Sequence, residues 1–520
     1  MISCAIIEHR GKWRLPAIGI GLLIALAPAG VLVFAAEGSS ATQFSNLLRS
    51  GFSTALLRSL AVAFSVASLA VVFGLPTGLV AGLYDFPLRR LLLAALVLPL
   101  LVPSFLGAIG LSMLRTALGL PSDSFLSGLT GTVLAFTMFA LPLVVFITLV
   151  SVRGITRSQT DAARLAGGGW HLVLCAGRNV LPVAVLTGLL ASVFTLSDPG
   201  PGQILGYNAA ASEILVSFAS QYDFALASRQ CLLLAAVVLV FALPVIVLLA
   251  PRLATGLLAR DVIAAPLMHN PTMTIAGPLL LAALFLVTSV LPLLGIAQPL
   301  LGSFPIERTM QEIGRTVGST MFYGVTASVI ATAAGVTLAL IAGRTFANRA
   351  ILTGGLLLLI ALPPALSALG FIQLASLCPS QLDALLRGQL TVSASLALRL
   401  VPITTIFALR SFGASSPTWA DAAAVHGVPF LTYLRKILLP WMSGAIFPAA
   451  VLVALLALSD VTTALLLHPP GKASLPLAIF TVMANAPESL VGALCVTYVA
   501  SAALALGLGT IVVGRRRRVL

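Results

Sequence analysis

Charged side chains stand at three places where the surrounding sequence is apolar. Arg399 lies inside an apolar run, and the pairs Ser197-Asp198 and Ser459-Asp460 end two long apolar stretches. A charge inside a membrane segment is a functional candidate, because its burial in lipid is costly. Two carboxylates at matching helix ends are suited to lining a path for a cation. These five residues are therefore candidates for a translocation path.

Each of these candidates has a simpler alternative. Near a helix end, Arg399 can extend its guanidinium to the membrane surface or pair with a neighbouring helix. The two Ser-Asp pairs can be ordinary solvated helix ends. The residue that corresponds to Arg399 in the first half is Phe139, which is apolar, so any role of Arg399 is limited to the second half.

A polar segment rich in small residues occurs twice between long apolar runs. One copy is Asp161-Ala162-Ala163 with Gly167, and the other is Asp421-Ala422-Ala423 with Gly427. Alanine favours helix, an aspartate near the helix start suits the helix dipole, and the glycine ends the helix. Each copy predicts a short surface helix, a turn, and a helix that enters the bilayer near Pro182 or Pro440. A low-profile helix of this kind fits a groove in another protein, although an ordinary amphipathic loop is the alternative.

The elements that position these residues are membrane helices. Hydrophobic residues make up 59% of the 520 residues and charged residues only 8%, and the mean hydropathy is +1.10. Apolar runs of about 20 residues recur, which is the length that crosses a bilayer as a helix. The alternation expected of a membrane barrel is absent. We expect an all-α, polytopic membrane protein.

The apolar runs predict about twelve transmembrane helices, six in each half. They fall near residues 16–36, 54–83, 90–114, 128–152, 180–197, 230–250, 275–297, 318–343, 350–375, 391–410, 441–467 and 490–514. The first run is longer than the core of a cleaved signal peptide, although Phe34-Ala35-Ala36 imitates a cleavage site. We interpret it as an uncleaved membrane helix.

The formal net charge of +14 reflects topology. Basic residues are concentrated in alternate loops and at both chain ends, which predicts that both termini and both Asp-Ala-Ala segments are cytoplasmic. No basic patch interleaved with aromatic residues is present, so we expect no nucleic-acid partner.

The two halves have matching features. Leu60 to Gly82 aligns without gaps with Met321 to Gly343, and Pro103 and Pro142 correspond to Pro364 and Pro402. Halves with the same hydropathy order and an even number of helices are parallel repeats, related by an axis along the membrane normal. We predict a first repeat at 1–252 with a loop at 153–180, a cytoplasmic linker at 253–274, and a second repeat at 275–520 with a loop at 410–440.

Residues for catalysis or cofactor binding are not evident. The five cysteines and five histidines are scattered without metal-ligand spacing. A phosphate-binding Gly-x-x-x-x-Gly-Lys-Ser/Thr motif is missing, and lysine occurs only at Lys12, Lys436 and Lys472. The sequence predicts no catalytic residues, no resident metal and no bound cofactor.

The Asp-Ala-Ala segments resemble the cytoplasmic "EAA" loop of permease subunits of binding-protein-dependent ABC importers. Asp421-Ala422-Ala423, Gly427 and Leu439-Pro440 fit the family pattern, with Asp in place of Glu. The first copy departs from it, because Gly167 and Pro182 are two residues further apart than Gly427 and Pro440. Two loops in one chain resemble the fused permeases, in which one polypeptide supplies both halves.

The resemblance is strongest to permeases for iron(III), with those for thiamine, aminoethylphosphonate and polyamines nearby. It rests on Ser197 to Gly200, Ile204 to Gly206 and Leu465 to Gly471. It implies a type I importer fold in the bacterial inner membrane and iron(III) as cargo. It also implies that each EAA loop forms a coupling helix in one of two separate ATPase subunits, and that a periplasmic binding protein delivers the cargo.

Two other classes of protein remain as alternatives. A secondary transporter of six plus six helices, driven by an ion gradient, predicts buried acids or histidines within helices as proton relays. Few such residues are visible, and the duplicated polar segment would have no purpose. A membrane-embedded enzyme requires clustered polar residues near an interface, and no such cluster is evident.

Overall fold

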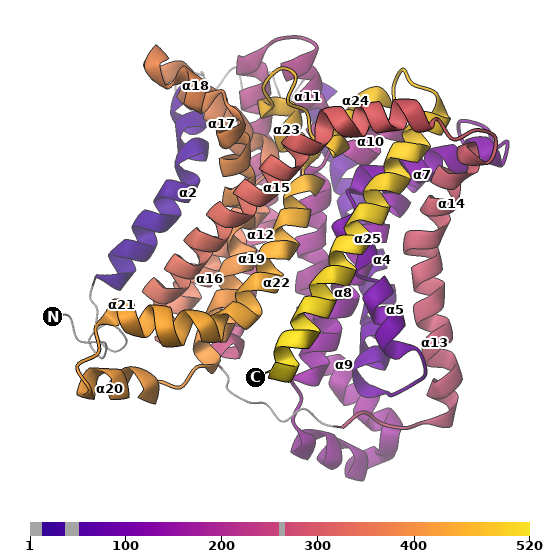
Figure 1. Cartoon of the computed structure of the whole chain (residues 1–520). Helices are drawn as coiled ribbons and strands as arrows, with labels where there is room; N and C mark the ends of the chain where they lie inside the picture. Colours follow the sequence, from indigo (N-terminus) through magenta and orange to yellow (C-terminus); the bar gives the residue numbers. More distant parts are fainter. Residues whose placement is uncertain (1–12, 37–50, 259–265, 520) are drawn as a thin grey trace.

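The computed structural model describes residues 13–36, 51–258 and 266–519, and this part of the chain is a bundle of long helices (Figure 1). Within it, ten helices are long and apolar enough to cross a membrane, and two bent helix pairs raise the total to twelve. Tyr84 and Met268 form an isolated bridge, and these described residues contain no strand. Helices predominate because every backbone polar group in lipid needs an internal partner. The prediction of a polytopic, all-helical membrane protein is confirmed.

The helices of the first half reach Leu258, eight residues beyond the predicted end of the sixth membrane run. They are α2 (Arg14–Ala36), α4 (Gly51–Leu83), α5 (Arg89–Ala95), α6 (Leu98–Leu101), α7 (Ser104–Ala117), α8 (Gly128–Arg153), α9 (Arg157–Ser197), α10 (Gly200–Ile204), α11 (Ala210–Ala219) and α12 (Phe224–Leu258). The start of the predicted linker therefore belongs to α12, and residues 259–265 of that linker lie outside the described residues.

The second half begins at Pro271. Its elements are α13 (Pro271–Phe285), η1 (Leu286–Val290), α14 (Leu291–Ala297), η2 (Gln298–Leu301), α15 (Ile306–Ala342), α16 (Phe346–Ala361), α17 (Pro364–Leu377), η3 (Ser380–Leu382), α18 (Asp383–Leu386), α19 (Gln389–Ala414), α20 (Thr418–Val425), α21 (Phe430–Tyr433), η4 (Leu434–Leu438), α22 (Leu439–Ser459), α23 (Val461–Leu467), α24 (Leu475–Val482) and α25 (Glu488–Val519). Of these, η1 and η4 are π-helical.

The runs predicted at 90–114 and 350–375 are sharply bent. The chain turns by 96° between Arg89–Leu101 and Ser104–Ala117, and by 86° between Phe346–Ala361 and Pro364–Leu377. Val102 and Leu362 precede prolines and have extended backbone angles, as the proline ring requires of its neighbour. The hydropathy pattern predicted these segments correctly, but prolines divide each of them into two helices.

The two halves are interlocked through close helix crossings. In α17, a Cβ added at Gly370 would lie 2.1 Å from the Pro28 carbonyl oxygen of α2. In α7, a Cβ at Gly110 would lie 2.4 Å from the Pro292 oxygen of α14. The first helix of the chain thus packs against the second half, and α14 packs against the first half.

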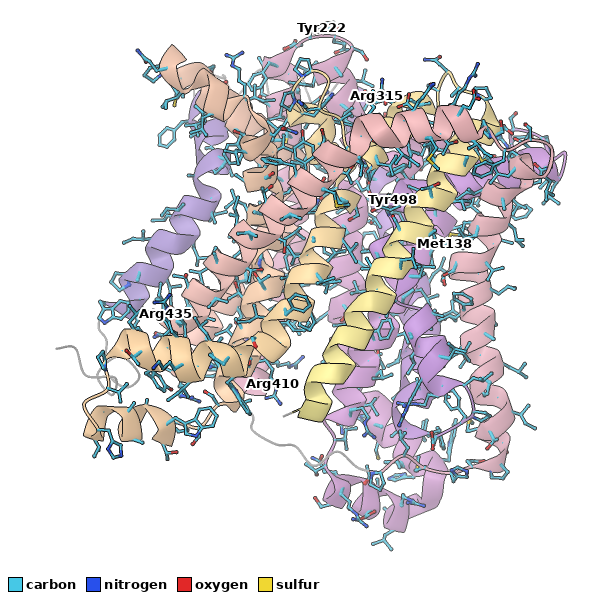
Figure 2. All side chains as sticks on the ribbon, viewed as in Figure 1. Met138, Tyr222, Arg315, Arg410, Arg435 and Tyr498 are labelled. Atoms are coloured by element: carbon cyan, nitrogen blue, oxygen red, sulfur yellow. The ribbon has the colours of Figure 1, made fainter. Side chains whose placement is uncertain are left out.

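Both Asp-Ala-Ala segments lie at one end of the bundle. α20, the Arg157 end of α9, the start of α2 and the end of α25 are all at the lower end of Figure 1. Arg410 and Arg435 lie at that end, whereas Tyr222 and Arg315 lie at the opposite end (Figure 2). We refer to these as the Asp-Ala-Ala end and the opposite end.

Candidate functional site

The first Asp-Ala-Ala helix, residues 157–166, projects from the bundle. Thr156 and Gln159 form a capping box at its start, with the Thr156 amide donating to Gln159 Oε1 at 3.0 Å. Asp161 lies beyond the first turn, contrary to the expectation that it stands near the helix start, and its Oδ2 is 3.8 Å from Arg157 Nε. Leu165, four residues after Asp161, is 90% exposed. This helix therefore displays an apolar side chain to solvent.

The second Asp-Ala-Ala helix is α20, which is attached more closely to the bundle. Ala420 and Ala423 are buried in the core of the second half. Trp419 packs edge-to-face on Trp441 of α22, with ring centroids 5.3 Å apart. Val425, four residues after Asp421, is 84% exposed and so matches Leu165 in the first copy.

Both helices end at a glycine in the left-handed region. Gly427 has φ 65°, and in the first copy the left-handed residue is Gly168, with φ 74°. Gly167, the glycine singled out from the sequence, has φ −170°, which any residue adopts. The spacing from Gly168 to Pro182 is only one residue longer than the spacing from Gly427 to Pro440.

The membrane-entering helices begin earlier than predicted. The first continues from Gly168 without another break to Ser197, with Pro182 in its interior. The second runs through α21, η4 and α22, so that Pro440 lies in its third turn and not at its start. The π-helical turn η4 immediately precedes Leu439-Pro440. Proline is tolerated there because the π turn changes the local hydrogen bonding.

A cavity of about 430 Å³ lies between the two halves at the level where these helices end. Its lining is mostly aliphatic and aromatic, and it draws side chains from residues 97–215 and 360–480. Four of the five path candidates line it: Asp198, Arg399, Ser459 and Asp460. Ser197 does not line it, because its buried hydroxyl donates to the Val193 carbonyl at 2.9 Å.

Asp198 is fixed from within the first half. Its Oδ2 accepts a hydrogen bond from the Ser104 hydroxyl, and its Oδ1 accepts one from the Gly200 amide at 2.9 Å. Ser104 opens α7 directly after the bend at Pro103. The sequence analysis missed Ser104, although a hydroxyl next to a helix-breaking proline was the available signal.

Asp460 is fixed in the second half and also carries the charge pair of the cavity. Its Oδ1 accepts from the Thr463 amide at 3.0 Å, which caps α23. Its Oδ2 lies 2.7 Å from Arg399 Nη1 and 3.0 Å from the Thr463 hydroxyl. The Arg399 and Asp460 side chains are 22% and 8% exposed, respectively. Arg399 is thus paired across helices inside the protein, and it does not extend to the membrane surface.

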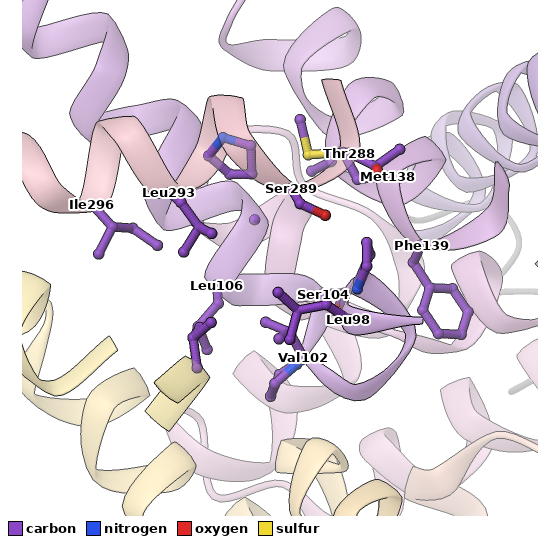
Figure 3. A pocket seen from close by; sticks show the side chains of 16 residues that line it. Leu98, Val102, Ser104, Leu106, Met138, Phe139, Thr288, Ser289, Leu293 and Ile296 are labelled. Atoms are coloured by element: carbon purple, nitrogen blue, oxygen red, sulfur yellow. The ribbon is translucent and has the colours of Figure 1, made fainter. Parts of the chain in front are cut away.

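A small side pocket of about 50 Å³ adjoins the cavity and shares Val102, Ser104 and Phe139 with it (Figure 3). The buried hydroxyl of Ser289, in the π-helical turn η1, points into this pocket and has no hydrogen-bond partner among the described residues. Phe139, the apolar counterpart of Arg399, packs edge-to-face on Phe194 at 6.1 Å. The wall of the cavity is therefore aromatic where the second half carries Arg399.

A multispan helical bundle with a partly charged cavity between its halves is typical of membrane transport proteins. No family model matches the chain. Over 190 residues, which are 35% of this chain and 68% of the relative, it is 34% identical to the probable molybdenum ABC transporter permease protein of Haloferax volcanii. The chain belongs to the ABC transporter permease family.

Proposed function

We propose that this chain is the permease subunit of an ATP-driven importer, which passes a small solute through the cavity between its halves. The observation that carries the proposal is the pair of Asp-Ala-Ala helices at one end. Each displays an exposed apolar residue, Leu165 or Val425, in the same place. One exposed apolar side chain is ordinary on a protein surface, but the same exposure at the same position of two copies supports a shared contact with partner subunits.

Each of these helices is connected to the cavity by a single long helix. The helix that follows Gly168 ends at Asp198, and the one that follows Gly427 ends at Asp460. The 30 residues of Phe430–Ser459 span about 45 Å at 1.5 Å per residue. Each Asp-Ala-Ala helix is therefore joined to a carboxylate of the cavity by one helix, along which a displacement can travel.

The proposal includes a fused pair of repeats. Both halves have the same order of elements. Each has one long helix, a bent pair and another long helix, followed by an Asp-Ala-Ala helix with its own long helix, and then by short helices before a last span. Gly74 and Gly335 correspond in the alignment of Leu60–Gly82 with Met321–Gly343, and they stand at matching crossings, where an added Cβ would lie 2.9 Å from Val144 and 2.3 Å from Thr404. Because the 190 aligned residues are 68% of the relative and 35% of this chain, the relative is about half as long.

The proposed partners follow from this arrangement. Each Asp-Ala-Ala helix seats in one of two ATPase subunits, which hydrolyse ATP, and a periplasmic binding protein delivers the cargo at the opposite end. Both termini and the Asp-Ala-Ala end are then cytoplasmic, and the chain lies in a bacterial inner membrane. The alternate-loop charge bias supports this orientation.

For the cargo we propose iron(III), on the resemblance carried by Ser197 to Gly200 and Leu465 to Gly471. The relative's name offers a second cargo, molybdenum, which in oxygenated water is an oxyanion. The two differ in charge, so one uptake assay separates them.

The test is co-purification of the chain with a candidate ATPase subunit, followed by ATP-dependent uptake in proteoliposomes supplied with the binding protein. We expect ATPase binding to be lost when Leu165 and Val425 are both replaced by Asp, with the membrane fold intact. Binding and uptake that survive this double change would refute the assignment.

A secondary transporter is the second candidate, and the charged cavity favours it, because buried acids suit proton relays. It predicts uptake that follows an imposed proton or sodium gradient without ATP. Uptake that requires ATP and ignores the gradient excludes it.

A further inference from the structure

Acidic residues outnumber basic residues in the lining of the cavity. Among the described residues that line it, the acids are Asp198 and Asp460 and the base is Arg399. The remaining lining groups are apolar or carry neutral hydroxyls. These three side chains lie inside walls of Phe, Leu, Val and Pro that provide little solvation, so that one acid, Asp460, has a basic partner and the other, Asp198, has none among the described residues of the lining.

The two carboxylates and the guanidinium differ in how firmly they are held. Asp198 is bound by the Ser104 hydroxyl and the Gly200 amide, and Asp460 by the amide and hydroxyl of Thr463. These partners belong to the half that carries each acid. Arg399 is held at the end of a long flexible side chain, where its Nη1 donates a hydrogen bond to Asp460. The acids are therefore fixed, and the arginine is the movable member.

A carboxylate without a counter-charge in such a cavity is strongly unfavourable, and it also attracts small cations. Arg399 supplies the counter-charge from within the protein. We propose that Arg399 is a tethered counter-cation, which occupies the Asp460 side of a cation site between transport cycles and is displaced by a positively charged cargo. This inference rests on the proposed function, and it names the charge class of the cargo.

The dimensions of the cavity restrict the cargo further. A volume of about 430 Å³ exceeds that of a bare ion, since one water occupies about 30 Å³ in the liquid. Among the described residues, no group of three or more His, Cys, Asp or Glu is placed to hold a metal. The site therefore suits a hydrated or ligand-bearing metal cation, or a small organic ammonium ion, held by charge without tight chelation. Weak binding is what a transport path requires, because the cargo has to leave again.

An oxyanion cargo is disfavoured by the same geometry. It would have to break the 2.7 Å pair between Arg399 and Asp460 and would then face two carboxylates. A cation has the opposite effect, because it replaces the guanidinium beside Asp460 in a cavity that Asp198 also lines. The charge of the cargo thus decides whether the displacement of Arg399 is favourable.

The experiment uses the chain with its ATPase subunits in proteoliposomes, and the binding protein is added for the uptake measurements. A first arm measures the passive leak of rubidium ions without ATP. Arg399→Gln should raise this leak several-fold, because the tethered charge is gone, and Arg399→Lys should restore the low leak. Arg315→Gln is the matched control, since Arg315 forms a 2.7 Å pair with Glu312 near the opposite end, away from the cavity. A leak in Arg399→Gln equal to that of the wild type overturns the proposal.

A second arm measures ATP-driven uptake of iron(III), putrescine and molybdate. The double variant Arg399→Met/Asp460→Leu removes the pair but keeps apolar packing, which proteins often tolerate. We expect uptake of the transported cation to fall to background while the ATPase still co-purifies. Wild-type uptake by this variant would show that the pair is only structural, and molybdate uptake abolished by Arg399→Gln would show an anion site.

The two arms separate this inference from the proposed function. If the wild type neither binds ATPase subunits nor transports with ATP, the proposed function fails. The rubidium leak still tests Arg399 in that case, because it needs neither ATP nor a known cargo.

Discussion

Replacement of the two left-handed glycines by alanine should uncouple the Asp-Ala-Ala helices from the helices that follow them. Gly168 and Gly427 have φ 74° and 65°, and a Cβ added at either position meets nothing within 4 Å. The cost of alanine is therefore in the backbone, about 1–2 kcal/mol for a left-handed L-residue and more at Gly168, whose ψ of −164° lies in a region essentially restricted to glycine. A cost of that size lowers the fraction of loops in the native turn roughly 5–30-fold.

Two other glycines provide matched controls. Gly169 is adjacent to Gly168, Gly444 lies in the interior of α22, and at both a Cβ meets open space without a positive φ. Alanine at these positions is favoured in a helix by roughly 1 kcal/mol over glycine. We expect Gly169→Ala and Gly444→Ala to leave ATP-dependent uptake unchanged or slightly improved.

The assay is ATP hydrolysis and uptake by the reconstituted transporter at equal membrane abundance of each variant. Gly168→Ala and Gly427→Ala should lower uptake more than ATP hydrolysis, because the ATPases still turn over while their motion is poorly transmitted. Equal uptake for Gly168→Ala and Gly169→Ala would refute the reasoning, since the two substitutions differ only in backbone conformation.

Three further predictions concern the two ends of the molecule. Single Leu165→Asp and Val425→Asp changes should each weaken ATPase co-purification, because each places a charge where an apolar side chain meets its partner. Asp421→Ala should lower uptake more than Asp161→Ala, because Asp421 lies in the first turn of a helix packed on the bundle, and matched uptake assays decide it. A cysteine at position 222, where Tyr222 is 87% exposed, should react with an impermeant thiol reagent from outside the cell, and one at position 165 only from within.

The sequence predicted the spans because membrane crossing depends on composition and length, which hydropathy measures directly. Prolines bend two of these spans, and the sequence contained that signal at Pro103 and Pro363. The angles of 96° and 86°, in contrast, depend on packing against other helices. Hydropathy alone does not distinguish a straight span from a bent pair of the same length.

The arrangement of the cavity was only partly predictable. Asp198, Arg399 and Asp460 were recognisable because a charge in an apolar run is unusual. Their partners were not, because Arg399 and Asp460 are 61 positions apart, and Ser104 and Asp198 are 94 apart. Likewise, Gly167 and Gly168 are chemically identical, and only the backbone angles show that Gly168 occupies the left-handed turn.

The two halves differ in which part of the connection between the Asp-Ala-Ala helix and the cavity is rigid. This difference affects how much each half contributes to the proposed coupling. The first Asp-Ala-Ala helix is loosely attached, but the helix that follows it runs from Gly168 to Asp198 without a π turn. The second is anchored by Ala420, Ala423 and the Trp419–Trp441 contact, whereas its long helix contains η4 and two prolines. A π turn is a place where a helix can change its local hydrogen bonding. The first connection is therefore compliant where its Asp-Ala-Ala helix meets the bundle and continuous along its length, and the second is the reverse. A displacement of the second Asp-Ala-Ala helix thus reaches Asp460 through a helix that can absorb part of it at η4.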